Sequence, residues 1–65
     1  MISYKPLWIT LLEKDKKKTD LLQIANISRG TLAKLSKNEI VSLKVLERIC
    51  IELDCSISDV IEITP

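Results

Sequence analysis

The sequence has no histidine and no phenylalanine, and among its 65 residues it has one glycine, two prolines and two cysteines. Without histidine the chain can form neither a Ser/His or Cys/His nucleophile pair nor a histidine metal site. A chain of this length buries only about 60% of its unfolded surface, which leaves little material for a catalytic cleft beside a core. These shortages argue against an enzyme and favour one small binding domain, residues 1–65.

The two cysteines lack the spacing of a zinc or redox motif. Four residues separate Cys50 from Cys55, and no further Cys or His could complete a set of four metal ligands. We interpret both as free thiols in a reducing cytosol, and we expect neither a metal nor another cofactor.

Long apolar runs are also absent. No stretch approaches the roughly 20 apolar residues of a membrane span, and the N-terminus lacks the apolar region of a signal peptide. The expected protein is therefore cytoplasmic and makes no membrane contact. In chains shorter than roughly 70 to 80 residues a single hydrophobic core gives little stability. We therefore expect efficient helix packing or a homodimer to stabilise this protein.

What the sequence does contain is a series of apolar stripes separated by short polar clusters, which predicts helices joined by tight turns. The first helix is expected from Pro6 to about Asp15, with its stripe at Leu7, Trp8, Leu11 and Leu12. Thr19 is the expected N-cap of a short second helix to about Ala25, and Ser28 that of a third. At the break between them, Asn26 can adopt the left-handed conformation usually left to glycine.

Ser42 is the expected N-cap of a fourth helix that ends at Asp54. Its apolar residues form the longest stripe, at Leu43, Val45, Leu46, Ile49, Cys50 and Leu53. Ser56 and Asp59 resemble a capping box opening a last short helix around Val60 and Ile61. The prediction is an all-α fold of five helices with almost no strand, in which residues 63–65 could fray or pair as a strand across a dimer.

Charge is unevenly distributed along the chain. Residues 1–45 hold nine Lys and Arg against four acids, whereas residues 46–65 hold one Arg against five acids. DNA affinity comes largely from neutralising phosphates, and acids elsewhere keep such a protein soluble. The basic part coincides with the second and third predicted helices.

These two helices have the arrangement that places a recognition helix in the major groove. Arg29 can present two donors to guanine, Lys34 can donate to the same edge, and Thr31 can contact phosphate or a thymine methyl. Ser28 and the free N–H groups beside it suit phosphate. Gly30 costs up to about 1 kcal/mol in a helix. Either something large comes close to the backbone there, or the glycine is neutral drift.

The order of these features resembles the Cro/C1-type (XRE-like) helix-turn-helix proteins, especially their short stand-alone bacterial and phage members. The resemblance covers nearly the whole chain, and its most telling parts are ISRGTLAKL at residues 27–35 and VSLKVLERICIELDCSISDVI at residues 41–61. It implies a compact five-helix, lambda-repressor-like domain, usually a dimeric transcriptional regulator and often a repressor.

The resemblance also implies roles for single residues. Arg29, Gly30 and Lys34 fall where the family reads bases. Residues that fall where the family contacts the DNA backbone are Lys18, Thr19, Thr31, Lys37 and Asn38. Asp20 would repel phosphate there unless its carboxylate points away.

The leading hypothesis is a sequence-specific regulator of double-stranded DNA, and two other functions are alternatives to it. A protein-interaction module of the same fold, antitoxin-like or accessory to a larger regulator, could use the acidic C-terminal part or the region of Trp8. A small enzyme would need paired acids, but Asp15 with Asp20, or Glu47 with Glu52, have an i,i+5 spacing that does not share a helix face.

Overall fold

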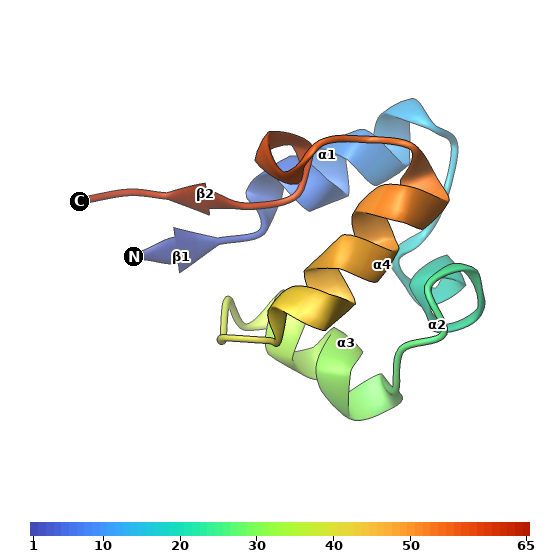
Figure 1. The fold of residues 1–65 in the computed structure, drawn as a ribbon, viewed down its shortest axis with the longest axis horizontal. Coiled ribbons are helices and arrows are strands. Elements are labelled where there is room, and N and C mark those ends of the chain that lie inside the picture. The colour runs from blue at the N-terminus through green and yellow to red at the C-terminus, as the bar shows by residue number, and fades with distance from the viewer.

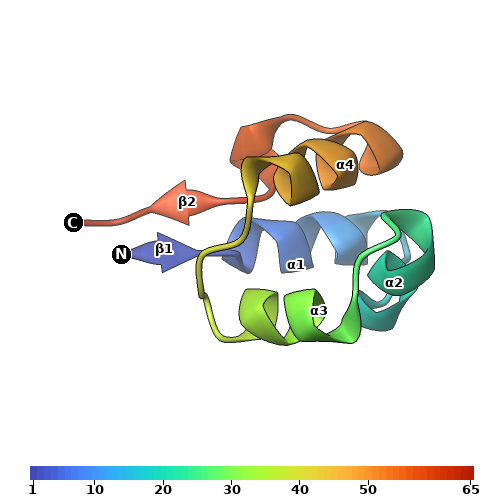
Figure 2. The ribbon, with the colours of Figure 1, turned by 60° about the horizontal axis from the view of Figure 1, so that its bottom comes forward.

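The computed structural model describes all 65 residues. The elements in chain order are β1 (Ile2–Ser3), α1 (Lys5–Glu13), the 3₁₀ helix η1 (Lys18–Asp20), α2 (Leu21–Ile24), α3 (Arg29–Ser36), α4 (Leu43–Leu53), the 3₁₀ helix η2 (Ile57–Asp59) and β2 (Glu62–Ile63). Figure 1 shows α4 crossing the molecule, with α3 along its lower edge and both chain ends on one side. In Figure 2, α1 lies between α4 and α3. No helix has both the length and the apolar character needed to cross a membrane.

The structure has four α-helices, so the expected count of five is not confirmed. The predicted capping box is present, because Asp59 Oδ2 accepts from the Ser56 N–H at 3.1 Å. It opens only the single turn η2, however, and Val60 follows that turn as a fully buried residue. A three-residue turn favours 3₁₀ geometry, and the chain then becomes extended.

The expectation of almost no strand is wrong for the two ends of the chain. β1 and β2 pair antiparallel, with Ile2 opposite Ile63 and Ser3 opposite Glu62. The Thr64 N–H extends the ladder by donating to the Met1 carbonyl at 2.8 Å. The β-branched residues of the tail favour this extended state. The tail thus pairs within its own chain and neither frays nor needs a dimer to form a strand (Figure 1).

Asp and Asn residues occupy the left-handed position at the helix ends, where glycine is usual. The residues with a left-handed φ of 51–59° are Asp15, Asn26, Asn38 and Asp54, so the left-handed conformation expected for Asn26 is confirmed. At three of these ends the next N–H reaches back to a carbonyl in the last turn, from Lys16 to Leu11, Glu39 to Lys34 and Cys55 to Cys50. These are Schellman closures, which satisfy carbonyls that the helix leaves free. They explain how a chain with one glycine makes so many tight turns.

The serine caps are confirmed, but the threonine cap is wrong. Ser28 Oγ accepts from the Thr31 N–H at 3.1 Å, and Ser42 Oγ accepts from the Val45 N–H at 3.2 Å. Thr19 instead lies inside η1. The longer Asp20 carboxylate caps this turn by accepting from the Lys17 N–H at 2.8 Å.

The core gathers residues from all four α-helices. Its buried members are Tyr4, Leu7, Leu11, Leu21, Ala25, Ile27, Leu35, Leu46, Ile49, Leu53 and Val60. Two residues expected in the apolar stripes lie outside it, since Leu12 is 78% exposed and Leu43 is 80% exposed. Leu12 and Leu43 each stand near the end of a helix, where no neighbouring element covers them.

Candidate DNA-binding surface

The helix-turn-helix consists of α2, the turn at residues 25–28 and α3. Ala25 and Ile27 are buried on either side of Asn26, so the core holds the turn from both ends. Arg48 of α4 also donates from Nη1 to the Asn26 carbonyl at 3.4 Å. From the sequence, Arg48 is only one charge in the acidic C-terminal part. No signal in its own segment identifies it as a residue that positions the turn, because its partner lies 22 positions away.

One face of α3 is open to solvent. Leu35 is fully buried and Leu32 is half-buried, whereas Arg29, Gly30 and Lys34 are exposed, as predicted. Ala33, which was not among the predicted site residues, is exposed on the same face, one helical turn after Arg29. The spacing of four residues from Arg29 was the available signal. A small residue there lets a partner come close, and its methyl group suits a thymine methyl.

Gly30 is not required by the fold. Its backbone has no left-handed φ, and a methyl group added at its Cα would meet only Ser28 Oγ, at an ordinary 3.7 Å. A helical alanine would therefore fit and would be more stable. The small size at position 30 leaves space on the outer face of α3, beside Arg29.

The first turn of α3 presents hydrogen-bond donors. The Ser28 hydroxyl accepts from the Thr31 N–H and donates to Thr31 Oγ1 at 3.0 Å, so these two side chains hold each other. The N–H groups of Arg29 and Gly30 lie in the first turn, where a helix has no carbonyl to receive them. The positive end of the helix dipole adds to this preference for an anion.

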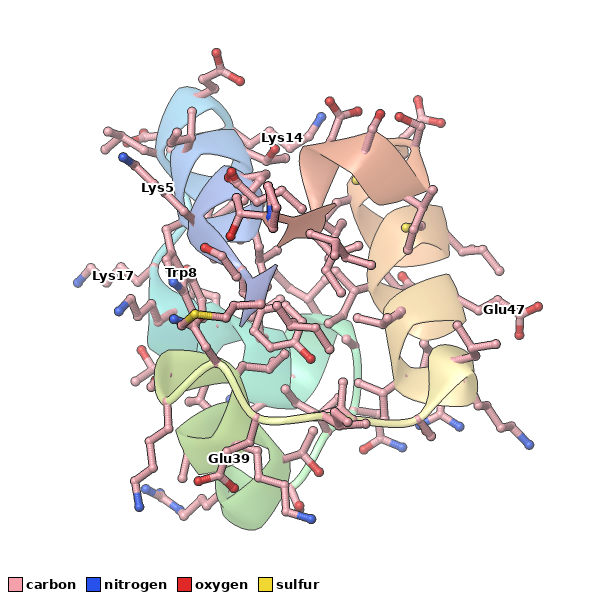
Figure 3. The ribbon with its side chains drawn as sticks, turned by 90° about the vertical axis from the view of Figure 1, so that its left-hand side faces the viewer. Lys5, Trp8, Lys14, Lys17, Glu39 and Glu47 are labelled. Atoms are coloured by element: carbon pink, nitrogen blue, oxygen red, sulfur yellow. The ribbon has the colours of Figure 1, made fainter.

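Lys18 and Thr19 precede α2 in sequence and lie at the edge of the candidate DNA-binding surface. Both are exposed, and Lys18 Nζ stands 4.3 Å from the centre of the Trp8 ring, a cation–π contact that holds the chain against α1. Trp8 itself is half-buried, with Lys17 on the same side of the molecule in Figure 3. The Asp20 carboxylate accepts from the Lys17 N–H, and this bond fixes its position at the start of η1.

Lys37 and Asn38 follow α3, and the structure separates their roles. Lys37 is exposed at the end of the helix. Asn38 has a left-handed backbone, and its Oδ1 accepts from the Tyr4 N–H at 3.0 Å. Asn38 is therefore a structural residue of this loop as well as a candidate contact.

Comparisons with known proteins agree with this geometry. The family model of the Cro/C1-type HTH DNA-binding domain matches residues 6–65. The crystal structure of the transcriptional regulator VanUg, Form II, is similar with a TM-score of 0.94 and 47% sequence identity, over 98% of this chain and 85% of that one. No curated protein sequence matches significantly. The buried turn, the serine-capped α3 and the family match together show that the chain belongs to the Cro/C1-type helix-turn-helix DNA-binding domains.

Proposed function

We propose that this protein is a sequence-specific transcriptional regulator, a repressor that binds double-stranded DNA as a homodimer and inserts α3 into the major groove. The observation that carries the proposal is the outer face of α3. Exposed cations surround the small residues Gly30 and Ala33 there, at a helix end with free N–H groups. An α-helix with such a face can approach base edges closely.

In this proposal Arg29 and Lys34 read bases. Arg29 stands at the first position of α3, the end that enters the groove in helix-turn-helix proteins. Its guanidinium can donate in parallel to O6 and N7 of guanine, and Lys34 can donate to the same edge of a neighbouring base. Gly30 has no side chain that could contact a base, and its role is to let the DNA come close to α3.

The remaining candidate residues would hold the phosphates. Lys18 and Thr19 lie before α2, the first turn of α3 contributes its N–H groups together with Ser28 and Thr31, and Lys37 and Asn38 lie after α3. Contacts from both ends of the helix-turn-helix fix its register on the duplex but carry no sequence information. Bound in this way, the domain would block other proteins from the same DNA, which is the basis for proposing repression.

A homodimer is proposed because one short recognition helix reads few base pairs. Two helices placed about 34 Å apart along the groove read two half-sites and add their specificities. The expected operator is therefore an inverted repeat.

The test is selection of bound fragments from sheared genomic DNA of the source organism at near-physiological salt, followed by sequencing. The proposal expects one enriched inverted repeat for the native chain and for Lys14→Ala, which changes an exposed lysine at the far end of α1. The double variant Arg29→Ala with Lys34→Ala is expected to lose the enrichment. No enrichment with the native chain, and only weak salt-sensitive binding to every duplex, would contradict the proposal and favour the protein-interaction module.

A further inference from the structure

The end of α4 brings the two cysteines together. The N–H of Cys55 donates to the Cys50 carbonyl at 3.0 Å, the longer bond of the Schellman closure at this end. The left-handed backbone of Asp54, with a φ of 51°, turns the chain back onto the helix. In a continuous helix, residues five positions apart lie on different faces. Here the closure instead sets positions 50 and 55 side by side, where it commonly joins two side chains.

The two thiols also interact with each other. Burial is the largest cause that raises the pKa of the Cys55 thiol, and the charge of Cys50 and a hydrogen bond with its side chain raise this pKa further. Both thiols are free, and both lie at the margin of the core, where they are partly exposed. A small reagent from the solvent can therefore reach them. The closure itself does not require sulfur, because the same backbone bond joins Leu11 with Lys16.

We infer that Cys50 and Cys55 form a reversible disulfide site within one chain, oxidised by a peroxide and reduced again by a cellular thiol such as glutathione. The bond fastens the end of α4 to the segment that leads into η2. In Figure 1 this end of α4 lies at the upper right, whereas α3 lies along the lower edge. The inference thus concerns a site outside the candidate DNA-binding surface and does not depend on the proposed function.

The oxidation uses one hydrogen peroxide for each bond. The Cys50 thiolate attacks a peroxide oxygen and the O–O bond breaks, which leaves a sulfenic acid on Cys50. The departing hydroxide takes up the proton that the Cys50 thiol had lost and becomes water. The Cys55 thiol then attacks the Cys50 sulfur, so that the S–S bond forms, the S–O bond breaks and a second water leaves. Two electrons pass from the two sulfurs to the peroxide oxygens.

The order of the two attacks follows from the surroundings of Cys55. Its raised pKa keeps this thiol protonated at neutral pH, and the thiolate is the form that attacks a peroxide. Cys50 is therefore assigned the first attack, and Cys55 resolves the sulfenic acid. Because the resolving thiol stands beside Cys50, the bond is expected to form before a second peroxide oxidises the sulfenic acid further.

Mass spectrometry of the full chain tests whether the bond forms. The reduced protein is treated in dilute solution with an equal concentration of hydrogen peroxide, and its intact mass is expected to fall by two hydrogen atoms. A protease that cuts after glutamate cleaves at Glu52, between the two cysteines. The fragments on either side of this cut are expected to stay joined until a reductant is added.

Two serine variants serve as matched controls. Cys55→Ser removes only the resolving thiol, so a sulfenic acid is expected to persist on Cys50, where dimedone traps it. Cys50→Ser is expected to react more slowly with peroxide, because only the protonated Cys55 thiol remains. Neither variant is expected to give fragments that stay joined after cleavage at Glu52.

A redox equilibrium shows whether the fold favours the bond. The oxidised fraction is measured in glutathione buffers of graded composition, once with the folded chain and once with the chain unfolded in urea. The side-by-side positions predict an equilibrium constant for bond formation about tenfold larger, or more, in the folded chain. The two equilibria are linked, so the oxidised protein is then expected to have a higher Tm than the reduced protein.

Three results would overturn the inference: disulfides between chains as the main product, oxidation of the cysteines without a bond between them, or an equilibrium constant in the folded chain no larger than in urea. The fragment selection that tests the proposed function is unaffected by any of these results, because neither cysteine lies on α3 or in the turn before it.

Discussion

The backbone N–H of Tyr4 donates to Oδ1 of Asn38 at 3.0 Å, across 34 positions of the chain. The Tyr4 hydroxyl adds a second bond to the same loop by donating to the Glu39 carbonyl at 2.7 Å. Tyr4 is only 1% exposed, so both bonds form where water does not compete freely. The residue that begins the fold before α1 thus holds the loop at which α3 ends.

Tyr4→Phe is expected to lower the free energy of unfolding by about 0.5 to 1.5 kcal/mol, because it removes the hydroxyl bond and leaves the ring in place. Urea denaturation followed by circular dichroism measures the change. Tyr4→Leu, which also loses the fit of the ring, is the larger perturbation and is expected to cost more. A Phe variant as stable as the native chain would show that the bond to Glu39 contributes nothing.

Burial also gives Tyr4 a pH dependence. Burial raises the pKa of the Tyr4 phenol above its ordinary value of 10.0, and a hydrogen bond with the Val41 backbone lowers it by less. Because the phenol has a higher pKa in the folded state than in the unfolded state, Tyr4 contributes its full share of the free energy of unfolding below about pH 10. That contribution is lost as the pH rises from the unfolded-state pKa through the folded-state pKa. Tyr4 is the only tyrosine, so absorbance at the tyrosinate band follows it alone. An onset of ionisation at the unfolded value, before any unfolding, would contradict this expectation.

Most helices could be predicted because their signals are local. The apolar spacing of α4 and the serines at positions 28 and 42 act within one or two helical turns, and the structure confirms them. The bond from Arg48 to Asn26 and the pairing of β1 with β2 join residues far apart in sequence, and no local pattern indicates them. For residues 63–65 the sequence allows fraying or pairing across a dimer, because pairing within one chain depends on both chain ends meeting.

The candidate DNA surface likewise combines features that local sequence patterns predict with contacts between residues far apart in sequence. Arg29, Gly30 and Lys34 could be placed on the outer face of α3 from helical periodicity alone, and they lie there. The bond from the Tyr4 N–H to Asn38 Oδ1 could not be foreseen, since it depends on where α1 begins relative to the end of α3. Leu43 fits the apolar stripe of α4 by spacing, but no segment covers it in the single chain.

The left-handed helix ends predict opposite effects for two substitutions at Asp54, where φ is 51°. Asp54→Gly relieves a conformation that costs other residues roughly 1 kcal/mol or more, and it is expected to raise the melting temperature. Asp54→Ala keeps the Cβ, loses the polar side chain and is expected to lower it. If both variants melted at the same temperature, the backbone conformation at this end would not limit stability.

Gly30→Ala is expected to stabilise the protein and weaken its binding to DNA. The added methyl fits, with its nearest neighbour Ser28 Oγ at 3.7 Å, and an alanine gains up to about 1 kcal/mol in a helix. The same methyl occupies space where the proposed function brings the DNA close. Thermal melting and binding to the selected operator measure the two effects on one sample. Unchanged operator affinity in a stabilised variant would place the DNA away from position 30.

Arg29→Ala and Lys37→Ala should both weaken operator binding, but in different ways. Loss of Arg29 is expected to cost about 1 to 3 kcal/mol and to relax the preference at one base pair, because a base contact discriminates among sequences. Loss of Lys37 is expected to weaken all duplexes alike and to lower the salt dependence by about one phosphate, a change of roughly 0.9 in the slope of log K against log salt. Binding to the operator and to single-base variants, measured over a range of salt concentrations, distinguishes the two. If both variants lost affinity equally on every duplex, Arg29 would contact phosphate and the reading of bases would depend on Lys34.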